Sequence, residues 1–167
     1  MGKPDLFSAD CSRCAALCCM ALAFDRGDHF DHDKAAGVGC HNLAGFTCGI
    51  HGDLAERGYS GCIAFDCLGA GQRVTELFEH DWRSDPSLTG PMIEAFRRMR
   101  EVQELRQLLV AAATLPLTDA IDDRRLDILD QLADAAGDLD RLEEVDPRAI
   151  RAWLRGLAEV ITPVTEA

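Results

Sequence analysis

All eight cysteines of this chain lie in its first 67 residues, and no cysteine follows them. They are Cys11, Cys14, Cys18, Cys19, Cys40, Cys48, Cys62 and Cys67. The start, MGKPDLFSADCSRC, lacks the basic residues, apolar run and cleavage site of a secretion signal, so we expect a cytoplasmic location. Stable disulfides are rare in that reducing compartment, whereas clustered thiolates bind metals there. Metal ligation is therefore our first interpretation, with disulfides and buried free thiols as the alternatives.

The first cysteine cluster has the spacing C-x2-C-x3-CC. In a helix, Cys11, Cys14 and Cys18 would share one face; as a turn, Cys11-x-x-Cys14 would be a knuckle that brings two thiolates to one ion. Cys19 would point about 100° away from Cys18 in a helix, because a turn has 3.6 residues. The adjacent pair is therefore better suited to two sites, or to one site and a structural contact, than to a single ion.

The other four cysteines are spread out, and Cys62-x4-Cys67 has a spacing that fits a metal-binding pair. Eight thiolates would fill two four-ligand sites, or one site with four left over. Thiolates are soft ligands that suit zinc, iron–sulfur clusters and Cu(I). The bacterial ferredoxin run C-x2-C-x2-C is not matched. Zinc and a [4Fe-4S] cluster are equal leading candidates, and copper comes well behind them.

The cysteines stand in four sequence contexts: C-x2-C-x3-CC, Cys40-His-Asn-Leu43, Cys48-Gly-Ile-His51 and Gly61-Cys62-Ile-Ala-Phe-Asp-Cys67. Their order resembles the zinc- or iron-chelating proteins with a C-x2-C-x2-CC signature, although this chain has one more residue before the double cysteine. The stretch ending at Gln72 is also similar to the Cys-rich N-terminal segment of actinobacterial pentapeptide-repeat proteins, but no five-residue repeats occur here. The resemblance is best over residues 10–72, and it implies a metal module without a defined reaction.

Histidines offer a few further ligands. His51 follows Cys48 by three residues and is a possible extra metal ligand, whereas His41 is less suited to share an ion with the adjacent Cys40. The run 25–33 contains His29 and His32 at helical spacing, which could bind a metal without the cysteines. It does not match the calcium-loop pattern, and we interpret it as a polar turn.

The sequence changes character near residue 72, where we place a domain boundary. Residues 1–72 are expected to form an irregular lobe that metal holds together, because a segment of this size buries little core. Residues 73–167 predict about three amphipathic helices, beginning near Pro91, Asp122 and Pro147. Pro116 and Gly137 suit the ends of the first two. The expected fold is mainly α, with this lobe followed by a small helical bundle.

The net charge of −12 disfavours nucleic acid and anionic membranes as partners. No apolar stretch is long enough to span a bilayer. Gly58-Tyr-Ser60-Gly61 is not a nucleophile elbow, and no catalytic constellation is recognisable, which argues against an enzyme. We expect a non-catalytic metal module that orders a structure, senses metal or redox state, or binds an unknown protein partner. The alternatives are an iron–sulfur redox component of an enzyme system and thiol-based metal storage.

Overall fold

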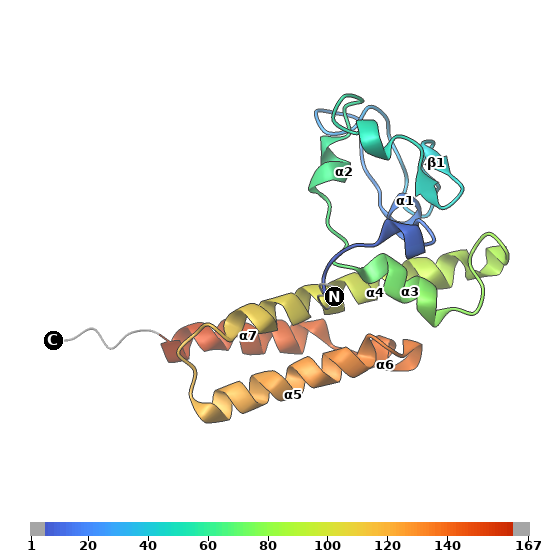
Figure 1. The fold of residues 1–167 in the computed structure, drawn as a ribbon. Helices are drawn as coiled ribbons and strands as arrows, with labels where there is room; N and C mark the ends of the chain where they lie inside the picture. The colour runs from blue at the N-terminus through green and yellow to red at the C-terminus, as the bar shows by residue number, and fades with distance from the viewer. Residues whose placement is uncertain (1–5, 162–167) are drawn as a thin grey trace, which may run out of the picture. The chain divides into compact units, whose positions relative to one another are not determined.

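The computed structural model describes residues 6–161. The chain divides into two compact units, of which the first ends at Arg100 and the second begins at Glu101. This division falls within the long helix α4 (Thr89–Ala112). Residues 6–161 contain seven α-helices and one two-stranded sheet, which confirms the expectation of a mainly α fold (Figure 1).

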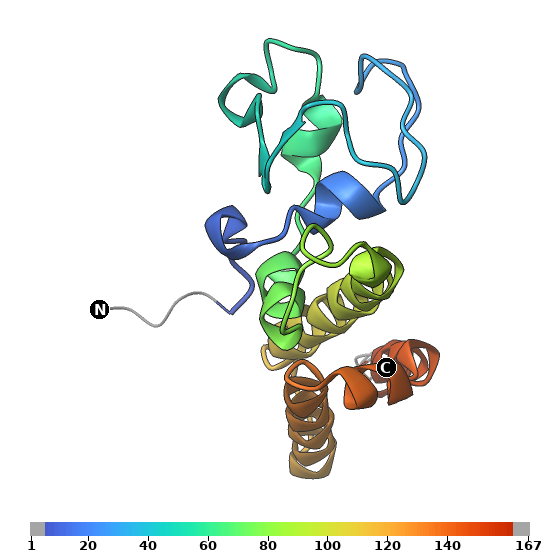
Figure 2. The same cartoon turned by 90° about the vertical axis from the view of Figure 1, so that its right-hand side faces the viewer.

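The Cys-rich part of the first unit is built from short elements joined by turns (Figure 2). They are η1 (Cys11–Arg13), α1 (Leu17–Ala21), β1 (Leu43–Ala44), β2 (Thr47–Cys48), η2 (His51–Asp53) and α2 (Ser60–Ala64). No helix described before residue 70 exceeds five residues. Such short helices are not stable by themselves, since helix nucleation is costly, so contacts with the rest of the unit must hold them.

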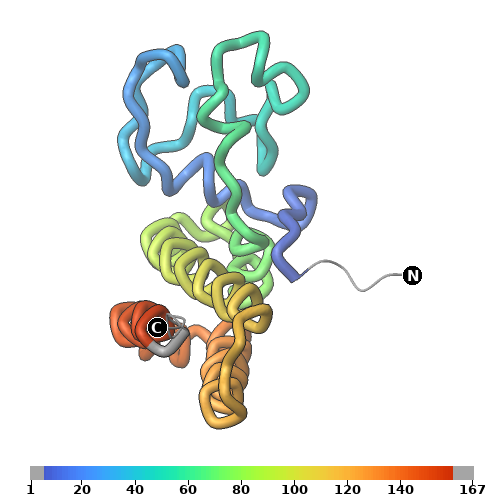
Figure 3. The backbone as a smooth tube through the Cα atoms, turned by 90° about the vertical axis from the view of Figure 1, so that its left-hand side faces the viewer, coloured from blue at the N-terminus to red at the C-terminus, as the bar shows by residue number. Residues whose placement is uncertain are grey.

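Backbone pairing folds the loops of this region back on themselves (Figure 3). Phe24 and Lys34 exchange backbone hydrogen bonds of 3.0 and 2.8 Å, and the Cys40 N–H donates to the Cys19 carbonyl at 3.0 Å. In the hairpin, Cys48 lies opposite Leu43. Gly45 opens its two-residue turn with a φ of +63°, the position where a type II′ turn requires glycine.

The remainder of the first unit is helical. It comprises α3 (Ala70–Leu77), η3 (Pro86–Leu88) and the start of α4. The predicted stripe of α4 is buried here, with Met92, Phe96 and Met99 at most 1% exposed. The helix begins at Thr89, two residues before the expected Pro91.

The second unit contains the end of α4, α5 (Asp119–Ala135), α6 (Leu139–Glu144) and α7 (Pro147–Ile161). Figure 1 shows α5 running back after α4, and α7 running opposite to α5. The Arg125 guanidinium donates to the Leu109 carbonyl at 3.2 Å, and Arg151 pairs with Glu104 at 3.0 Å, so α5 and α7 both contact α4. Leu105, Leu109 and Leu132 are part of the buried core of the second unit.

The three predicted helices correspond to α4, α5 and α7, while α6 was not predicted. Gly137 follows α5 as expected, and Asp146 accepts a hydrogen bond from the Arg148 N–H at the start of α7. The extra helix α6 has only six residues, and the Asp138 carboxylate caps it by accepting from the Arg141 N–H. None of the described helices has the length and apolar character that a membrane crossing requires.

Candidate metal centre

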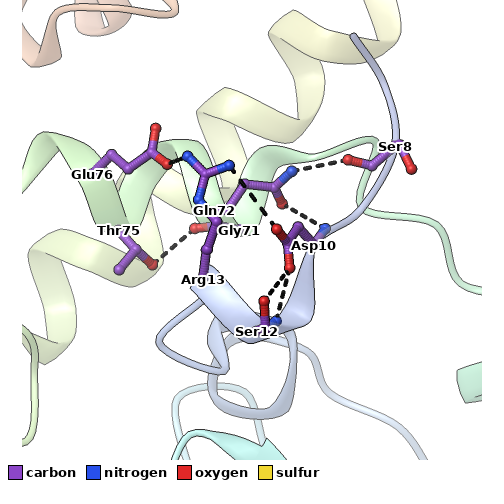
Figure 4. Close-up of polar contacts among 8 residues, drawn as sticks. All are labelled: Ser8, Asp10, Ser12, Arg13, Gly71, Gln72, Thr75 and Glu76. Carbon is purple, nitrogen blue, oxygen red and sulfur yellow. Dashed lines mark hydrogen bonds and ion pairs between the residues drawn. The ribbon is translucent and has the colours of Figure 1, made fainter. Parts of the chain in front are cut away.

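A network of polar contacts holds the first cysteine turn against α3 (Figure 4). The Gln72 side chain accepts from the Asp10 N–H at 3.1 Å and donates to the Ser8 carbonyl at 2.9 Å. The Asp10 carboxylate in turn accepts from the Ser12 N–H at 3.1 Å and so caps η1. Arg13 pairs with Glu76 on the exposed side of α3. These contacts join residues more than 60 positions apart and fix where Cys11 and Cys14 lie.

The backbone between Cys14 and Cys18 is held just as closely. The Ala15 N–H donates to the Thr75 hydroxyl at 2.9 Å, and the Trp82 indole N–H donates to the Ala15 carbonyl at 2.7 Å. A Cβ at Gly71 would lie 2.5 Å from the Cys14 sulfur. Only glycine therefore allows α3 to approach the Cys14 side chain this closely.

Two non-glycine residues of the described chain have a left-handed backbone, and both flank cysteines. Ala16, with φ of 55°, lies between Cys14 and Cys18, and Leu68, with φ of 52°, follows Cys67. This conformation costs a residue with a Cβ about 1–2 kcal/mol. Strain of this kind concentrates at functional sites, where the surrounding structure enforces it.

We group Cys11, Cys14, Cys18 and Cys67 as a first thiol set, because charges at Cys18 and Cys67 act on both Cys11 and Cys14. Burial raises the pKa of Cys14 to about 11, while N–H groups of Leu17 and Ala16 donate to its sulfur and oppose that rise. Burial also raises the pKa of Cys11, and the charges of Cys18 and Cys67 raise it further. The Cys18 and Cys67 charges act on Cys14 too, so these four sulfurs lie within electrostatic range.

We group Cys19, Cys40, Cys48 and Cys62 as a second thiol set, and charges also act between the sets, from Cys48 on Cys11 and from Cys18 on Cys62. Burial raises the pKa of Cys62 to about 11, and charges at Cys40 and Cys48 add to that rise. The hydrogen bond with Cys18 raises the pKa of Cys19, and charges at Cys40 and Cys48 raise it further. The sets meet at the adjacent pair, where the Cys19 thiol donates a hydrogen bond to the Cys18 sulfur and lowers the pKa of Cys18 to about 7.

The buried lysine Lys34 lies beside these thiols and was not predicted as part of the site. It is 6% exposed, and its ammonium donates to the carbonyls of Met20, Leu22 and Ala35. Burial lowers its pKa, whereas charges at Cys40, Cys19, Cys18 and Cys62 oppose that change. An ammonium at this place offsets the negative charge of clustered thiolates, which would otherwise be costly to bury.

The sulfurs share one neighbourhood without forming a tight cluster. No three donor atoms that include a cysteine sulfur lie within 4.8 Å of one another among the described residues. One zinc ion with Zn–S bonds of about 2.3 Å would bring four sulfurs to about 3.8 Å apart. A cluster of four irons keeps its ligands farther apart, because each thiolate binds a different iron. The donor type fits both groups.

One compact group of ligand-type atoms does occur among the described residues, and it contains no cysteine. Atoms of Asp31, His32 and His41 all lie within 4.8 Å of one another. His29, the other histidine of the run 25–33, instead lies 2.8 Å from the Ser60 hydroxyl through Nδ1. The possible ligand His51 is exposed at the start of η2. Sequence spacing did not predict the meeting of His32 and His41, because it depends on how the loops fold back.

Comparison with known proteins gives a single named relative and no function. The uncharacterized protein YybG of Bacillus subtilis (strain 168) is 38% identical over 117 residues, which cover 68% of this chain and 42% of YybG. This chain therefore spans less than half the length of that relative. No protein-family model matches the chain, and no solved structure does.

Proposed function

We propose that the Cys-rich region is a metal-binding module in which the eight cysteines hold metal through two four-thiolate sets. The support is the convergence of thiols from five separate segments, residues 11–14, 18–19, 40, 48 and 62–67, around the Cys18–Cys19 pair. The resemblance to zinc- or iron-chelating Cys-rich proteins points the same way.

Burial raises the pKa of Cys14 and Cys62 to about 11 and favours their thiols, but three features of the surroundings would support thiolates bound to a metal. Backbone N–H groups donate to the sulfurs of Cys14 and Cys18. Such hydrogen bonds to metal-bound sulfur stabilise its charge and tune the metal. The buried ammonium of Lys34 supplies a positive charge next to both sets. Ala16 and Leu68 hold a strained backbone beside the cysteine turns.

Thiolate ligands suit an iron–sulfur cluster and a zinc ion alike, and a cluster is the first candidate we test. Closing four sulfurs onto one zinc would require them to move nearer than the described structure has them. Zinc is the second candidate, since all ligands are thiolates and zinc accepts a four-cysteine site. In either case the role we propose is non-catalytic: the metal orders a surface for a protein partner or responds to metal or redox state.

The test is the iron, zinc and acid-labile sulfide content of the full chain, purified without oxygen. Iron with near-equal sulfide is expected for the cluster, and zinc without sulfide for the structural ion. A matched variant, Cys14→Ser, should lose metal from the first set only. Protein that retains neither metal after anaerobic reconstitution would overturn the proposal. More than about two ions per chain without acid-labile sulfide would indicate thiol-based storage, because two four-thiolate sites use all eight cysteines.

A further inference from the structure

The side chains of Asp31, His32 and His41 converge on one point next to the buried Tyr59. The Tyr59 hydroxyl donates to the Asp31 carboxylate, and it lies 2.9 Å from His32 Nδ1 and 3.1 Å from His41 Nε2. His32 Nδ1 is also 2.7 Å from the Asp31 carboxylate. Two imidazole nitrogens and a carboxylate oxygen thus gather around the Tyr59 hydroxyl.

The scaffold that brings these side chains together is well defined. His32 lies in the loop closed by the Phe24–Lys34 backbone pair, and its ring meets the Phe24 ring edge-on at 5.0 Å. His41 follows Cys40, whose N–H is bound to the Cys19 carbonyl. The rings of His32 and His41 then stack with centroids 3.7 Å apart and planes 25° apart. Tyr59, only 2% exposed, is fixed beneath them.

Charge and access suit a cation at this centre. Hydrogen bonds from Tyr59 and His32 hold the pKa of Asp31 below its usual value, so its carboxylate is ionised near neutral pH. The Asp31 side chain is 53% exposed and the His32 side chain 20% exposed, which leaves a path for an ion and room for water ligands. The ring nitrogens of His32 and His41 can each offer a lone pair to a metal ion.

If no ion is bound, the same atoms form a hydrogen-bond network, and this network requires a proton on each of the two imidazole nitrogens. The Tyr59 hydroxyl has one proton, which goes to Asp31, so both imidazoles would have to donate an N–H into the cluster. A metal needs these nitrogens deprotonated. The two accounts can therefore be separated by experiment.

We propose that Asp31, His32 and His41 bind one divalent transition-metal ion of the zinc class, at a site chemically distinct from the thiolates. Two imidazoles and one carboxylate with an open position for water are a set that zinc, cobalt(II) and non-haem iron(II) accept. The site uses none of the cysteines as a ligand, so its ion can be told apart from metal bound by sulfur.

The experiment is a cobalt(II) titration of the full chain, purified without oxygen, followed by calorimetry and visible absorption. Cobalt bound by nitrogen and oxygen lacks the intense sulfur-to-cobalt charge-transfer band that thiolates give. We expect one ion per chain of this kind, in addition to the metal held by the cysteines. Asp31→Asn and His41→Ala should weaken its binding at least about tenfold, as is usual when a metal site loses a supporting group. His80→Ala, an exposed histidine outside the cluster, is the control and should change nothing.

Two outcomes would overturn the proposal. One is the absence of any cobalt without the sulfur band in the wild-type chain. The other is loss of sulfur-bound cobalt in His41→Ala, which would assign His41 to the thiolate site. Circular dichroism checks that the variants fold. If His41→Ala does not fold, Asp31→Asn provides the test, because the exposed Asp31 side chain is replaced by one of equal size.

Discussion

Residues 6–67 and residues 101–159 are of similar length, but they bury apolar side chains to different extents. The large buried apolar residues of the Cys-rich region are Leu17, Met20, Leu54 and Tyr59. Those of the second unit are Val102, Leu105, Leu109, Ile128, Leu132, Leu142 and Leu157. The second unit arranges them as stripes on long helices, whereas the Cys-rich region has helices of five residues or fewer.

Under the metal-binding proposal, this difference reflects two ways of stabilising a fold within one chain. Burial of apolar area contributes about 25 cal/mol per Å², which is sufficient where long helices pack along their stripes. A region with so little core needs another source, and metal binding can supply it because its free energy becomes folding free energy. The predictions that follow test this contrast in order of decreasing effect.

Removal of metal should have the largest effect, and it should be confined to one region. Structural zinc contributes about 10–16 kcal/mol in small metal domains, so the Cys-rich region should unfold when a strong chelator is added. Hydrogen exchange with mass spectrometry on the full chain would show fast exchange in residues 11–67 and unchanged protection in α5 and α7. Equal protection of residues 11–67 before and after metal removal would contradict the proposal that metal stabilises the Cys-rich region.

Truncation in the helical core should destabilise the second unit and leave the metal content unchanged. Leu132 is 1% exposed, so Leu132→Ala should cost about 2–5 kcal/mol through lost burial and a cavity. Leu126→Ala on the same helix is the control, because that side chain is 43% exposed and should cost less than about 0.5 kcal/mol. Urea unfolding followed at α5, together with metal analysis, measures both effects; loss of metal in Leu132→Ala would contradict the account.

Adding a methyl group at Gly71 should disturb the first thiol set without removing a ligand. The new Cβ would lie 2.5 Å from the Cys14 sulfur, and overpacking of this kind costs about 1–3 kcal/mol. We expect Gly71→Ala to lower metal content and protection near Cys14. Gly90→Ala is the matched control, since no atom lies within 4 Å of its Cβ and alanine favours a helix. Equal behaviour of the two variants would show that the contact is unimportant.

The smallest effect is expected where polar contacts hold η1 on α3. Gln72→Ala removes two hydrogen bonds, to Asp10 and Ser8, and each contributes about 1 kcal/mol. Glu76→Ala removes only the exposed pair with Arg13, which should contribute less than about 1 kcal/mol. Unfolding midpoints of the metal-loaded chain would rank the two; a larger loss for Glu76→Ala would reverse our assignment of the main contact.

The sequence was sufficient to predict the long helices but not the short ones. Stripes and end signals predicted α4, α5 and α7 because those helices are long enough to repeat their pattern. The six residues of α6 and the eight of α3 are too few for a periodic signal. In α3, burial is limited to Ala70, Gly71 and Val74, and the requirement at Gly71 comes from Cys14, which lies far away in sequence.

The candidate site was predictable only as far as residue type carries information. The number and clustering of the cysteines identified them as candidate metal ligands, and their ligand role remains a prediction. No sequence pattern placed Lys34 at the site, because its burial depends on the loops that surround it. His32 and His41 meet only after residues 24 and 34 pair and Cys40 binds Cys19, contacts that no local spacing encodes.

X-ray absorption at the metal edge of the full chain tests the central claim most directly, since it identifies the atoms bound to the metal. The account predicts a first shell of sulfur at about 2.3 Å, with neighbouring iron as well if the metal is a cluster. A shell of nitrogen and oxygen alone, with no sulfur, would contradict the proposal that the cysteines hold the metal.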